Sequence, residues 1–369
     1  MQFFGETKID FIGLRKIAFV ISAIAIAAGV ISLIVKGGPG LGLDFTGGIE
    51  VHARFENFPS IIQIRQALAK VGLGRAVIQQ YGPRSENTVL VRYHMERISE
   101  DIATGIIDYR EKKGGFESVE ELKNVPAIEG VGYENLAAIF TVEPQAEGRV
   151  NLNKVDRETL TSIIQEVNSR QMVSRIEQAM KEQFGEKNPF EIISINLIGP
   201  KVSKELQRSA ILAIIFALIG MLIYIAWRFE FRFAVGAVIA LIHDVVISVG
   251  ALSLGGYEFT LPVIAALLTI VGYSLNDTIV IYDRIRENMK THRKRKTLIR
   301  SILNLSINQS LSRTVITSLT TFIVVLVLFL WGGQPLRAFT FTLLVGVIVG
   351  TYSSSFVATP VVYIWGKKK

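Results

Sequence analysis

The sequence predicts an α-helical membrane protein with six transmembrane helices and one outer α+β domain of the ferredoxin-like kind, which carries a small helical insertion. Three observations support this fold class. Hydrophobic residues make up 50% of the 369 positions, and they are gathered in blocks. About six blocks reach the roughly 20 apolar residues that span a hydrocarbon core about 30 Å thick. Between the first two blocks, residues 36–208 show the strand and helix periodicities of a water-exposed domain.

The first predicted transmembrane helix is Ile17–Val35, after a short N-terminal segment, residues 1–16. A cleavable signal peptide is the alternative, but the apolar block is long and no small-residue cleavage site follows it. The stretch GLGLDFTGG leads from it directly into structured-looking sequence. We therefore expect this helix to remain in the membrane.

The outer domain, residues 36–208, shows the order β-α-β-β-α-β. A first strand is followed by the helical stretch SIIQIRQALAKVG, whose expected N-cap is Ser60. RAVIQQYG and NTVLVRYHM indicate two strands around the turn Gly82-Pro83. A long amphipathic helix then ends at Gly185, and FEIISINLIGP is a last strand. The apolar residues that alternate along the first strand are Ile49, Val51, Ala53 and Phe55. This order fits the ferredoxin-like split βαβ unit.

One block between the third strand and the long helix does not fit that order. Residues from about 97 to 155 are charged, helical in periodicity and interrupted by Gly-Gly, Asn-Val-Pro and Glu-Gly-Val-Gly. The stretch IIDYREKKGGFESVEELKNVPAI is similar to helix-hairpin-helix sequences, some of which bind DNA through a Gly-x-Gly turn. Here that turn, residues 129–132, lies beside an acidic run, whereas phosphate binding needs positive charge. We expect a protein-contact or spacer module and no nucleic-acid binding.

Five further apolar blocks lie within residues 209–366, and a basic tail, residues 367–369, ends the chain. Each block is long enough to cross a bilayer as a helix. The predicted transmembrane segments are Ser209–Trp227, Phe233–Leu254, Leu261–Tyr282, Thr314–Trp331 and Ala338–Trp365.

Lys and Arg are concentrated in some of the short connections. They precede the first segment, lie between the second and third, and crowd the connection between the fourth and fifth. The third-to-fourth connection has neither, and the fifth-to-sixth has only Arg337. Cytoplasmic loops are enriched in Lys and Arg. We therefore expect a multi-pass protein of the cytoplasmic (inner) membrane, with both termini in the cytoplasm and residues 36–208 in the periplasm or outside. The net charge of +8 mostly reflects this bias.

The composition also excludes several classes of site. The chain has no cysteine, which excludes disulfides and thiolate metal sites. It has no Gly-x-x-x-x-Gly-Lys-Ser/Thr nucleotide loop, and its four histidines are scattered, without a Ser-His-Asp arrangement. We therefore expect no enzyme, no cofactor and no metal centre.

The fourth predicted helix contains Asn276 and Asp277. A carboxylate at membrane depth costs roughly 2.5–3.5 kcal/mol on insertion scales. Tyr273 and Ser274 precede Asp277 by four and three residues, so they share its face and are able to hydrogen-bond it. The alternative is a boundary residue that reaches water, because Arg284 follows about two turns later. A short acidic side chain reaches poorly toward water, so the pattern favours an ionisable site inside the bundle.

Polar residues also occur in the third and fifth predicted helices. ALIHDVVISVG places His243 and Asp244 in mid-helix, within a stripe of small or polar residues that also suits plain helix packing. Arg313 opens the fifth helix, as an interfacial residue or as counter-ion of a carboxylate. An acid and a base within a bundle are the usual parts of a proton relay. We expect Asp277, Arg313 and Asn276 to take part in ion coupling, with Asp244 as a further candidate.

Four stretches resemble the SecF branch of the SecD/SecF protein-export family, within the resistance-nodulation-division superfamily. They are GLDFTGGIEV after the first helix, VGYSLNDTIVIYDRIREN in the fourth, LSRTVITSLTTF in the fifth and GTYSSSFVATP in the sixth. The resemblance covers the whole chain apart from the insertion, which typical SecF chains lack. It implies that the proton-linked positions are Asp277 and Arg313. The other motif positions are Asp44, Phe45, Thr46, Gly47, Gly48, Gly272, Tyr273 and Ser274.

The resemblance implies a complex with SecD, docked on the SecYEG channel, that uses the proton-motive force to promote movement of translocating preproteins across a lipid membrane. The residues leave two other classes open: a proton-driven transporter half for small molecules or lipids, and a structural assembly factor without ion flow. A costly acid in a helix argues against the assembly factor. The motif resemblance favours export over small-molecule transport, and the coupling ion is left open between proton and sodium.

Overall fold

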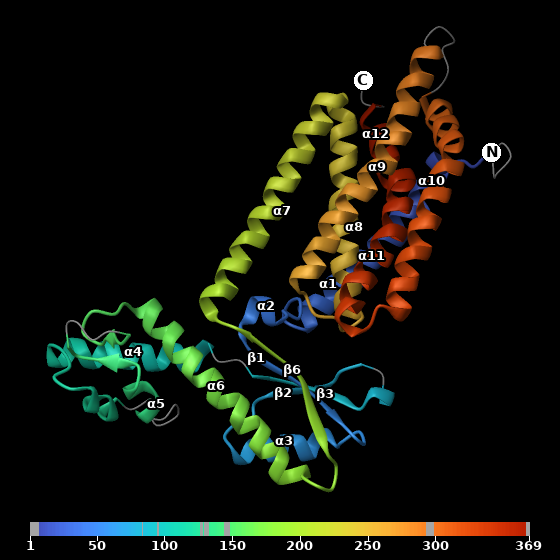
Figure 1. Cartoon of the computed structure of the whole chain (residues 1–369). Coiled ribbons are helices and arrows are strands. Elements are labelled where there is room, and N and C mark those ends of the chain that lie inside the picture. Colours follow the sequence, from blue (N-terminus) through green and yellow to red (C-terminus); the bar gives the residue numbers. More distant parts are fainter. Residues whose placement is uncertain are drawn as a thin grey trace. The chain divides into compact units, whose positions relative to one another are not determined.

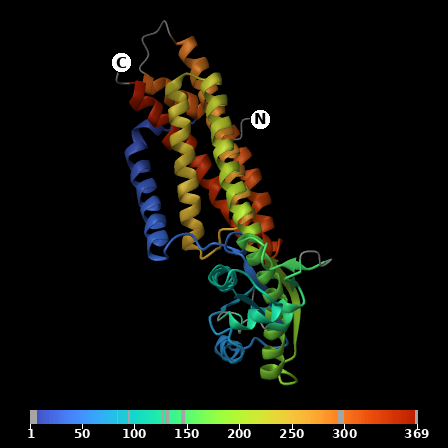
Figure 2. The same cartoon turned by 90° about the vertical axis from the view of Figure 1, so that its left-hand side faces the viewer.

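The structure is a computed structural model that describes residues 7–82, 84–93, 96–125, 128, 133–143, 148–292 and 299–366. The chain forms two compact units. One is helical and comprises Met1–Gly42 with Ser209–Lys369, and the other is α+β and comprises Leu43–Arg208. Figures 1 and 2 show the long helices of the first unit running side by side. The predicted fold class is confirmed.

Six helical segments in the described part of the chain are long and apolar enough to cross a membrane, as predicted. Their helices are α1 (Phe11–Val35), α7 (Pro200–Arg228), α8 (Phe231–Leu254), α9 (Leu261–Thr291), α10 (Ile299–Trp331) and α11 (Gln334–Ser353), which a π-helical turn (Ser354–Ala358) joins to α12 (Thr359–Gly366). At least half of the apolar stretch is buried in α8, in α9 and in the segment from α11 to α12, whereas α1, α7 and α10 are mostly exposed. The inside of the bundle is therefore formed by α8, α9 and α11.

The helix α10 begins well before the apolar block from which it was predicted. It starts at Ile299, whereas the block starts at Thr314. In these first turns Asn304 accepts a hydrogen bond from the backbone N–H of Ile12 at 3.0 Å. Asn304 also donates to Asp10, the N-cap residue of α1, at 2.6 Å. A hydropathy profile does not detect this part of the helix, because it contains polar residues. Their hydrogen-bond partners lie almost 300 positions away in the sequence.

Two helix pairs approach so closely that only glycine fits between them. Gly29 of α1 faces Gly250 of α8, and a Cβ on either residue would lie 2.6–2.7 Å from the Cα of the other. A Cβ on Gly346 of α11 would overlap the side chain of Ile270 of α9. Helices in lipid attract each other largely by van der Waals packing, so small residues at such crossings allow close contact. The absence of a side chain at these glycines allows α1 to pack closely on α8 and α11 to pack closely on α9.

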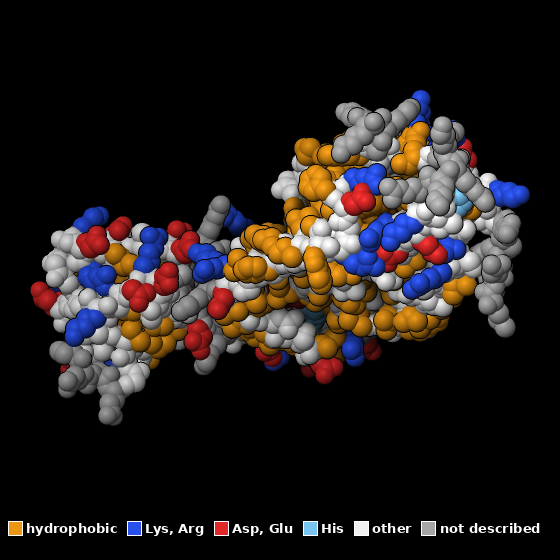
Figure 3. Space-filling model, turned by 90° about the horizontal axis from the view of Figure 1, so that it is seen from above, with side chains coloured by type: hydrophobic (Ala, Val, Ile, Leu, Met, Phe, Trp, Pro, Cys, Tyr) orange, Lys and Arg blue, Asp and Glu red, His pale blue; other side chains and the backbone are white. Residues whose placement is uncertain are grey.

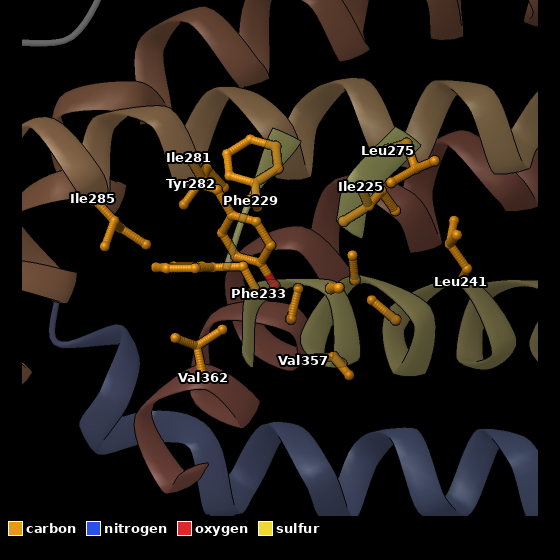
Figure 4. Close-up of a cluster of buried hydrophobic side chains, with 14 of the residues drawn as sticks. Ile225, Phe229, Phe233, Leu241, Leu275, Ile281, Tyr282, Ile285, Val357 and Val362 are labelled. Atoms are coloured by element: carbon orange, nitrogen blue, oxygen red, sulfur yellow. The ribbon is translucent and has the colours of Figure 1, made fainter. Parts of the chain in front are cut away.

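An aromatic cluster packs α9 against α8 and the turn between α7 and α8. Figure 4 shows Tyr282 of α9 beside Phe229 and Phe233. The ring of Tyr282 meets these two rings edge-on, with centroids 5.8 and 4.9 Å apart. The Tyr282 hydroxyl points at Gly236 of α8, where a Cβ would lie 2.6 Å from it. A small residue at position 236 is therefore needed for this ring to enter the core.

Lys and Arg side chains gather at the end of the helical unit that holds the α7–α8 turn, and Figure 3 looks onto this end. Arg228 binds Asp283 at 2.9 Å, and Arg284 binds Glu287 at 2.6 Å. Asp283 therefore lies at this end of α9, and its partner is Arg228. Much of the predicted basic connection, residues 293–298, and the tail, residues 367–369, lie outside the described residues.

The α+β unit contains a four-stranded antiparallel sheet in the order β2-β3-β1-β6. Its strands are β1 (Gly48–Phe55), β2 (Val77–Gln80), β3 (Thr88–Tyr93) and β6 (Phe190–Ile198), and a short 3₁₀ turn, Arg84–Glu86, precedes β3. The helix α3 (Ile61–Lys70) and the second half of α6 (Arg157–Phe184) pack on one face of the sheet. Both elements begin and end close to the predicted points, with Gly185 terminating α6 at a φ of 38°. The predicted ferredoxin-like order is confirmed.

The opposite face of this sheet buries a charged group. Glu50 accepts hydrogen bonds from the Nε of Arg92 at 2.9 Å and from the Nε2 of His52 at 2.7 Å, and all three residues are buried. Burial by itself raises the pKa of Glu50, but the His52 hydrogen bond and the charge of Arg92 outweigh it and hold the pKa at about 2. The ionised carboxylate is therefore part of the folded domain.

The insertion has a hydrophobic core of its own. Its elements are α4 (Glu96–Lys113), a 3₁₀ turn (Val119–Asn124), α5 (Tyr133–Ala137) and the short parallel strands β4 (Phe140–Thr141) and β5 (Val150–Asn151). The core also includes Leu160 and Ile164 from the first half of α6. The insertion is thus tied to α6 beyond its expected limit near residue 155. The predicted hairpin turn, residues 129–132, lies outside the described residues.

Candidate functional site

Asp277 lies near the middle of α9 and is only 2% exposed. Among the described residues, Ser318 of α10 is the one side-chain donor to its carboxyl, at 3.4 Å. Thr351 of α11 donates in turn to Ser318, at 2.7 Å. Such burial does not fit a boundary residue that reaches water. A carboxyl with one long hydrogen bond in a low-dielectric core is suited to binding and releasing a proton, because neither charge state is fully stabilised.

Asp244 lies in the middle of α8, fully buried, and has more hydrogen-bond partners than Asp277. Its Oδ2 accepts from Ser274 of α9 at 2.6 Å and from Ser353 of α11 at 2.8 Å. Its Oδ1 lies 2.9 Å from the Nδ1 of His243, whose Nε2 lies 2.8 Å from the hydroxyl of Ser22 in α1. Four helices therefore converge on this second acid.

Arg313 is exposed, and within the described part of the chain no ion pair of 4 Å or less joins it to Asp277. Its guanidinium is still near enough for its charge to act on that carboxyl. Asn276 faces outward from the bundle. The structure thus brings Asp277 and Arg313 into the same region without direct contact, and it places Asn276 away from both acids.

The hydrogen bonds that the sequence suggested for Asp277 are not the ones observed. Ser274 donates to Asp244, and the buried hydroxyl of Tyr273 has no partner among the described residues. Side chains three residues apart on an α-helix point in directions that differ by about 60° around the helix axis. Asp277 therefore faces α10, while Ser274 faces α8.

Several hydroxyl groups that bond the two acids, directly or through Ser318, were not predicted. Thr351, Tyr352 and Ser353 are consecutive residues of α11 and serve both acids, because Thr351 reaches Ser318 and Ser353 reaches Asp244. Directly after them comes the π-helical turn Ser354–Ala358, and the hydroxyl of the next residue, Thr359, donates to the carbonyl of Ser354. Such turns are frequent at functional sites. The signal in the sequence is the run TYSSS, five hydroxyl residues within an apolar block.

The motif Asp44–Gly48 is structural. Residues Leu43–Thr46 form one helical turn, α2, with Phe45 buried. Gly47 and Gly48 follow with φ of 63° and 116°, a conformation that other residues rarely adopt. A Cβ on Gly47 would also lie 3.2 Å from the carbonyl oxygen of Ile198. The motif therefore turns the chain into β1.

The chain matches the family model described as protein export membrane protein SecD/SecF, C-terminal, over residues 177–368, and a helix-hairpin-helix motif over residues 90–141. The protein translocase subunit SecF of Desulfurispirillum indicum is 39% identical over 358 residues, which cover 97% of this chain and 91% of that protein. The subunit of the same name from Calditerrivibrio nitroreducens is 37% identical, with 98% and 95% covered.

Solved structures of SecDF are also similar. The crystal structure of SecDF, a translocon-associated membrane protein from Thermus thermophilus, has a TM-score of 0.69 at 30% identity. The alignment covers 98% of this chain and 39% of that one. SecDF in its super-membrane-facing form has a TM-score of 0.57 at 28% identity, with 100% and 40% covered. The chain thus spans about two fifths of the SecDF proteins and nearly all of the SecF relatives.

Proposed function

The chain belongs to the SecD/SecF family of protein-export membrane proteins, and from this premise we propose that it works as a SecF-type subunit that uses the proton-motive force to promote preprotein translocation. The observation that carries the energy-coupling part is the buried carboxyl of Asp277 in α9. An acid that costs several kcal/mol to bury in a membrane needs a function that repays this cost. Ion coupling is such a function.

In this proposal Asp277 alternates between a neutral and an ionised form. A buried carboxyl favours the neutral form, and an approaching guanidinium favours the ionised form. Movement of Arg313 relative to Asp277 would therefore load and release the proton. The hydrogen bonds from Asp277 through Ser318 to Thr351 provide a link by which the charge state affects the packing of α9, α10 and α11.

We propose SecD as the partner within the membrane, on a face of α9 that the chain leaves uncovered. Ala265, Thr269, Gly272 and Asn276 are exposed and follow one another every three or four residues. Small residues permit close helix contact, and a polar amide at membrane depth is favourable only when it is hydrogen-bonded. This face suits another helix better than lipid. The SecYEG channel and the preprotein are further partners implied by the family resemblance.

The proposed orientation follows from the Lys and Arg bias, with the α+β unit outside and the α9–α10 connection in the cytoplasm of the cell. The chain has no cysteine, so a single introduced cysteine is its only thiol and any labelling can be assigned to that position. A cysteine at exposed Glu117 should react with an impermeant thiol reagent added to intact cells, whereas one at Glu287 should react only after the membrane is opened. Labelling of position 287 in intact cells would reverse the orientation.

The test of proton coupling is export into inverted membrane vesicles, with and without a proton gradient. Asp277→Asn keeps the shape of the side chain but cannot exchange a proton. We expect this variant to insert and bind its partner normally while losing at least about 90% of the gradient-dependent stimulation, since one transferring group is removed. Arg313→Met should impair the same step by removing the charge that acts on the acid.

Asp283→Asn is the matched control, because Asp283 is an exposed acid two turns further along α9 that binds Arg228. It should keep most of the stimulation. If Asp277→Asn retains the full effect of the gradient, the carboxyl is structural and the coupling mechanism is wrong.

A further inference from the structure

A polar cluster around Asp244 takes no part in the proton step described for Asp277. The cluster, called here the His–Asp cluster, consists of Ser22, His243, Asp244, Ser274 and Ser353, and each of these residues is buried. Tyr352 of α11 adjoins it, with its hydroxyl 3.2 Å from that of Ser22. Together these residues connect α1, α8, α9 and α11 by short hydrogen bonds.

The hydrogens at the α1 end of the cluster can be counted, because some atoms have only one role. Tyr352 donates its hydroxyl hydrogen to the carbonyl oxygen of Ala18 at 2.6 Å, so toward Ser22 it can only accept. If Ser22 donates to Tyr352, the oxygen of Ser22 must accept from the Nε2 of His243, 2.8 Å away. Completing these bonds therefore requires a hydrogen on Nε2.

The other end of the cluster then needs one more hydrogen. The Nδ1 of His243 and the Oδ1 of Asp244 are 2.9 Å apart, and one of them must carry a hydrogen to bond. Ser274 and Ser353 donate to the other carboxyl oxygen, Oδ2, so they do not supply it. All bonds of the cluster are made only if the pair holds one proton more than a neutral imidazole beside a carboxylate.

The deprotonated alternative is weaker on two grounds. The Ser22 hydroxyl would have to turn toward Nε2, and the bond from Ser22 to Tyr352 would be lost. The pair would also carry a negative charge inside the bundle, where no Lys or Arg of the described residues forms an ion pair with Asp244. A net charge at membrane depth is costly.

We propose that His243 and Asp244 together hold one proton, as a second proton-binding site of the bundle that is separate from Asp277. Its part in transport rests on the proposed function, whereas the proton itself does not. Loss of this proton would turn Ser22 from Tyr352 to His243 and so remove one bond between α1 and α11. Proton binding at this site would thereby strengthen the contact of α1, the first transmembrane helix, with α11.

The surroundings of the pair contain few other titratable groups. Tyr352 faces it from α11, and α1 contributes the uncharged Ser22. On α9 the contact is Ser274, while Asp277, one turn further along, faces Ser318 instead. Among the described residues no hydrogen bond joins the two acids, so we treat them as two separate sites.

The test is nitrogen NMR of the full chain in lipid nanodiscs, with ¹⁵N-labelled histidine, between about pH 5 and pH 10. The chain has four histidines, and His243→Gln identifies the signal of interest. We expect Nε2 to carry a hydrogen at neutral pH and to be bare at alkaline pH. The one hydrogen that then remains on the pair should lie on Nδ1. A bare Nε2 with a protonated Nδ1 over the whole range would overturn the proposal.

Two serine variants separate this role from plain packing. Ser22→Ala removes two hydrogen bonds from the protonated cluster, Nε2–H to Ser22 and Ser22 to Tyr352, but only one, Ser22 to Nε2, from the deprotonated cluster. The midpoint of proton loss should therefore fall by about one pH unit, a tenfold loss of proton affinity. Ser248→Ala, on the same helix one turn from Asp244, should leave the midpoint unchanged, because the buried Ser248 hydroxyl has no hydrogen-bond partner among the described residues. Equal midpoints in both variants would contradict the hydrogen count.

The variant Asp277→Asn distinguishes this inference from the proposed function. The His243 titration should persist in it, and its disappearance would mean that the two acids form one site and that the inference is wrong. If the titration persists while export into vesicles keeps its full gradient dependence, the proposed role of Asp277 fails and the second proton site stands.

Discussion

At the scale of single residues, the partners of a buried carboxyl decide how it responds to pH. Glu50 has a pKa of about 2 in the folded domain, against 4.5 for an unperturbed Glu. Because the folded pKa is the lower one, ionised Glu50 stabilises the fold above pH 4.5. This contribution is lost as the pH falls from 4.5 toward 2. We expect the free energy of unfolding of the outer domain to drop by roughly 2–3 kcal/mol over that interval.

The measurement is urea unfolding of the full chain, followed by a dye on a single cysteine introduced at exposed Ile62 of α3. Glu50→Gln is the control, since its amide cannot ionise. That variant should be less stable at pH 7 and should lose less stability on acidification. Identical acid sensitivity in both proteins would show that Glu50 is not responsible.

At the scale of helices, close crossings make glycine indispensable at particular positions. A Cβ at position 29 would lie 2.6 Å from the backbone of Gly250, and neither helix backbone can give way cheaply. We expect Gly29→Ala to lower the thermal stability of the protein in detergent, with a cost of about 1–3 kcal/mol for overpacking. The same substitution at Gly250 should act similarly.

Gly220 of α7 offers a matched control, because nothing lies within 4 Å of a Cβ built there. Gly220→Ala should be neutral or slightly stabilising, since Gly in a helix interior costs up to about 1 kcal/mol relative to Ala. Equal losses at positions 29 and 220 would attribute the effect to the helices themselves and not to their crossing.

At the scale of the whole molecule, the uncovered face of α9 is expected to contact SecD. A Cβ on Gly272 meets nothing within 4 Å, so the chain itself accommodates a larger side chain there. Gly272→Leu should therefore leave the level of protein in the membrane unchanged. Because the leucine would block close helix contact, co-purification of SecD should fall about tenfold. Gly220→Leu, on an exposed part of α7, is the control that tests whether any bulky residue in the membrane has this effect. Normal co-purification of SecD with the Gly272→Leu variant would exclude this face of α9 as the contact.

The early start of α10 and the packing of α6 in two cores both depend on contacts between segments far apart in the sequence. Local sequence patterns do not reveal such contacts. The first half of α6 lies in the core of the insertion and its second half in the core of the sheet. Its amphipathic pattern predicts one helix correctly but not that two cores share it. Removing residues 97–155 would leave Leu160 and Ile164 uncovered, so the insertion is less independent of the rest of the domain than its sequence suggests.

The sequence by itself determined the six spans, the ferredoxin-like order of the outer domain and an ionisable residue at position 277. These are local properties, because the length of an apolar block, the period of a strand and an acid within a membrane helix are each visible within about 20 residues. Only the tertiary structure decided which hydroxyl groups serve which acid. Ser274 bonds Asp244 and not Asp277, and His243 becomes part of a site through Ser22, 221 positions away. A hydrogen bond depends on the direction of a side chain around its helix and on the neighbour that happens to face it, and packing between distant segments sets both.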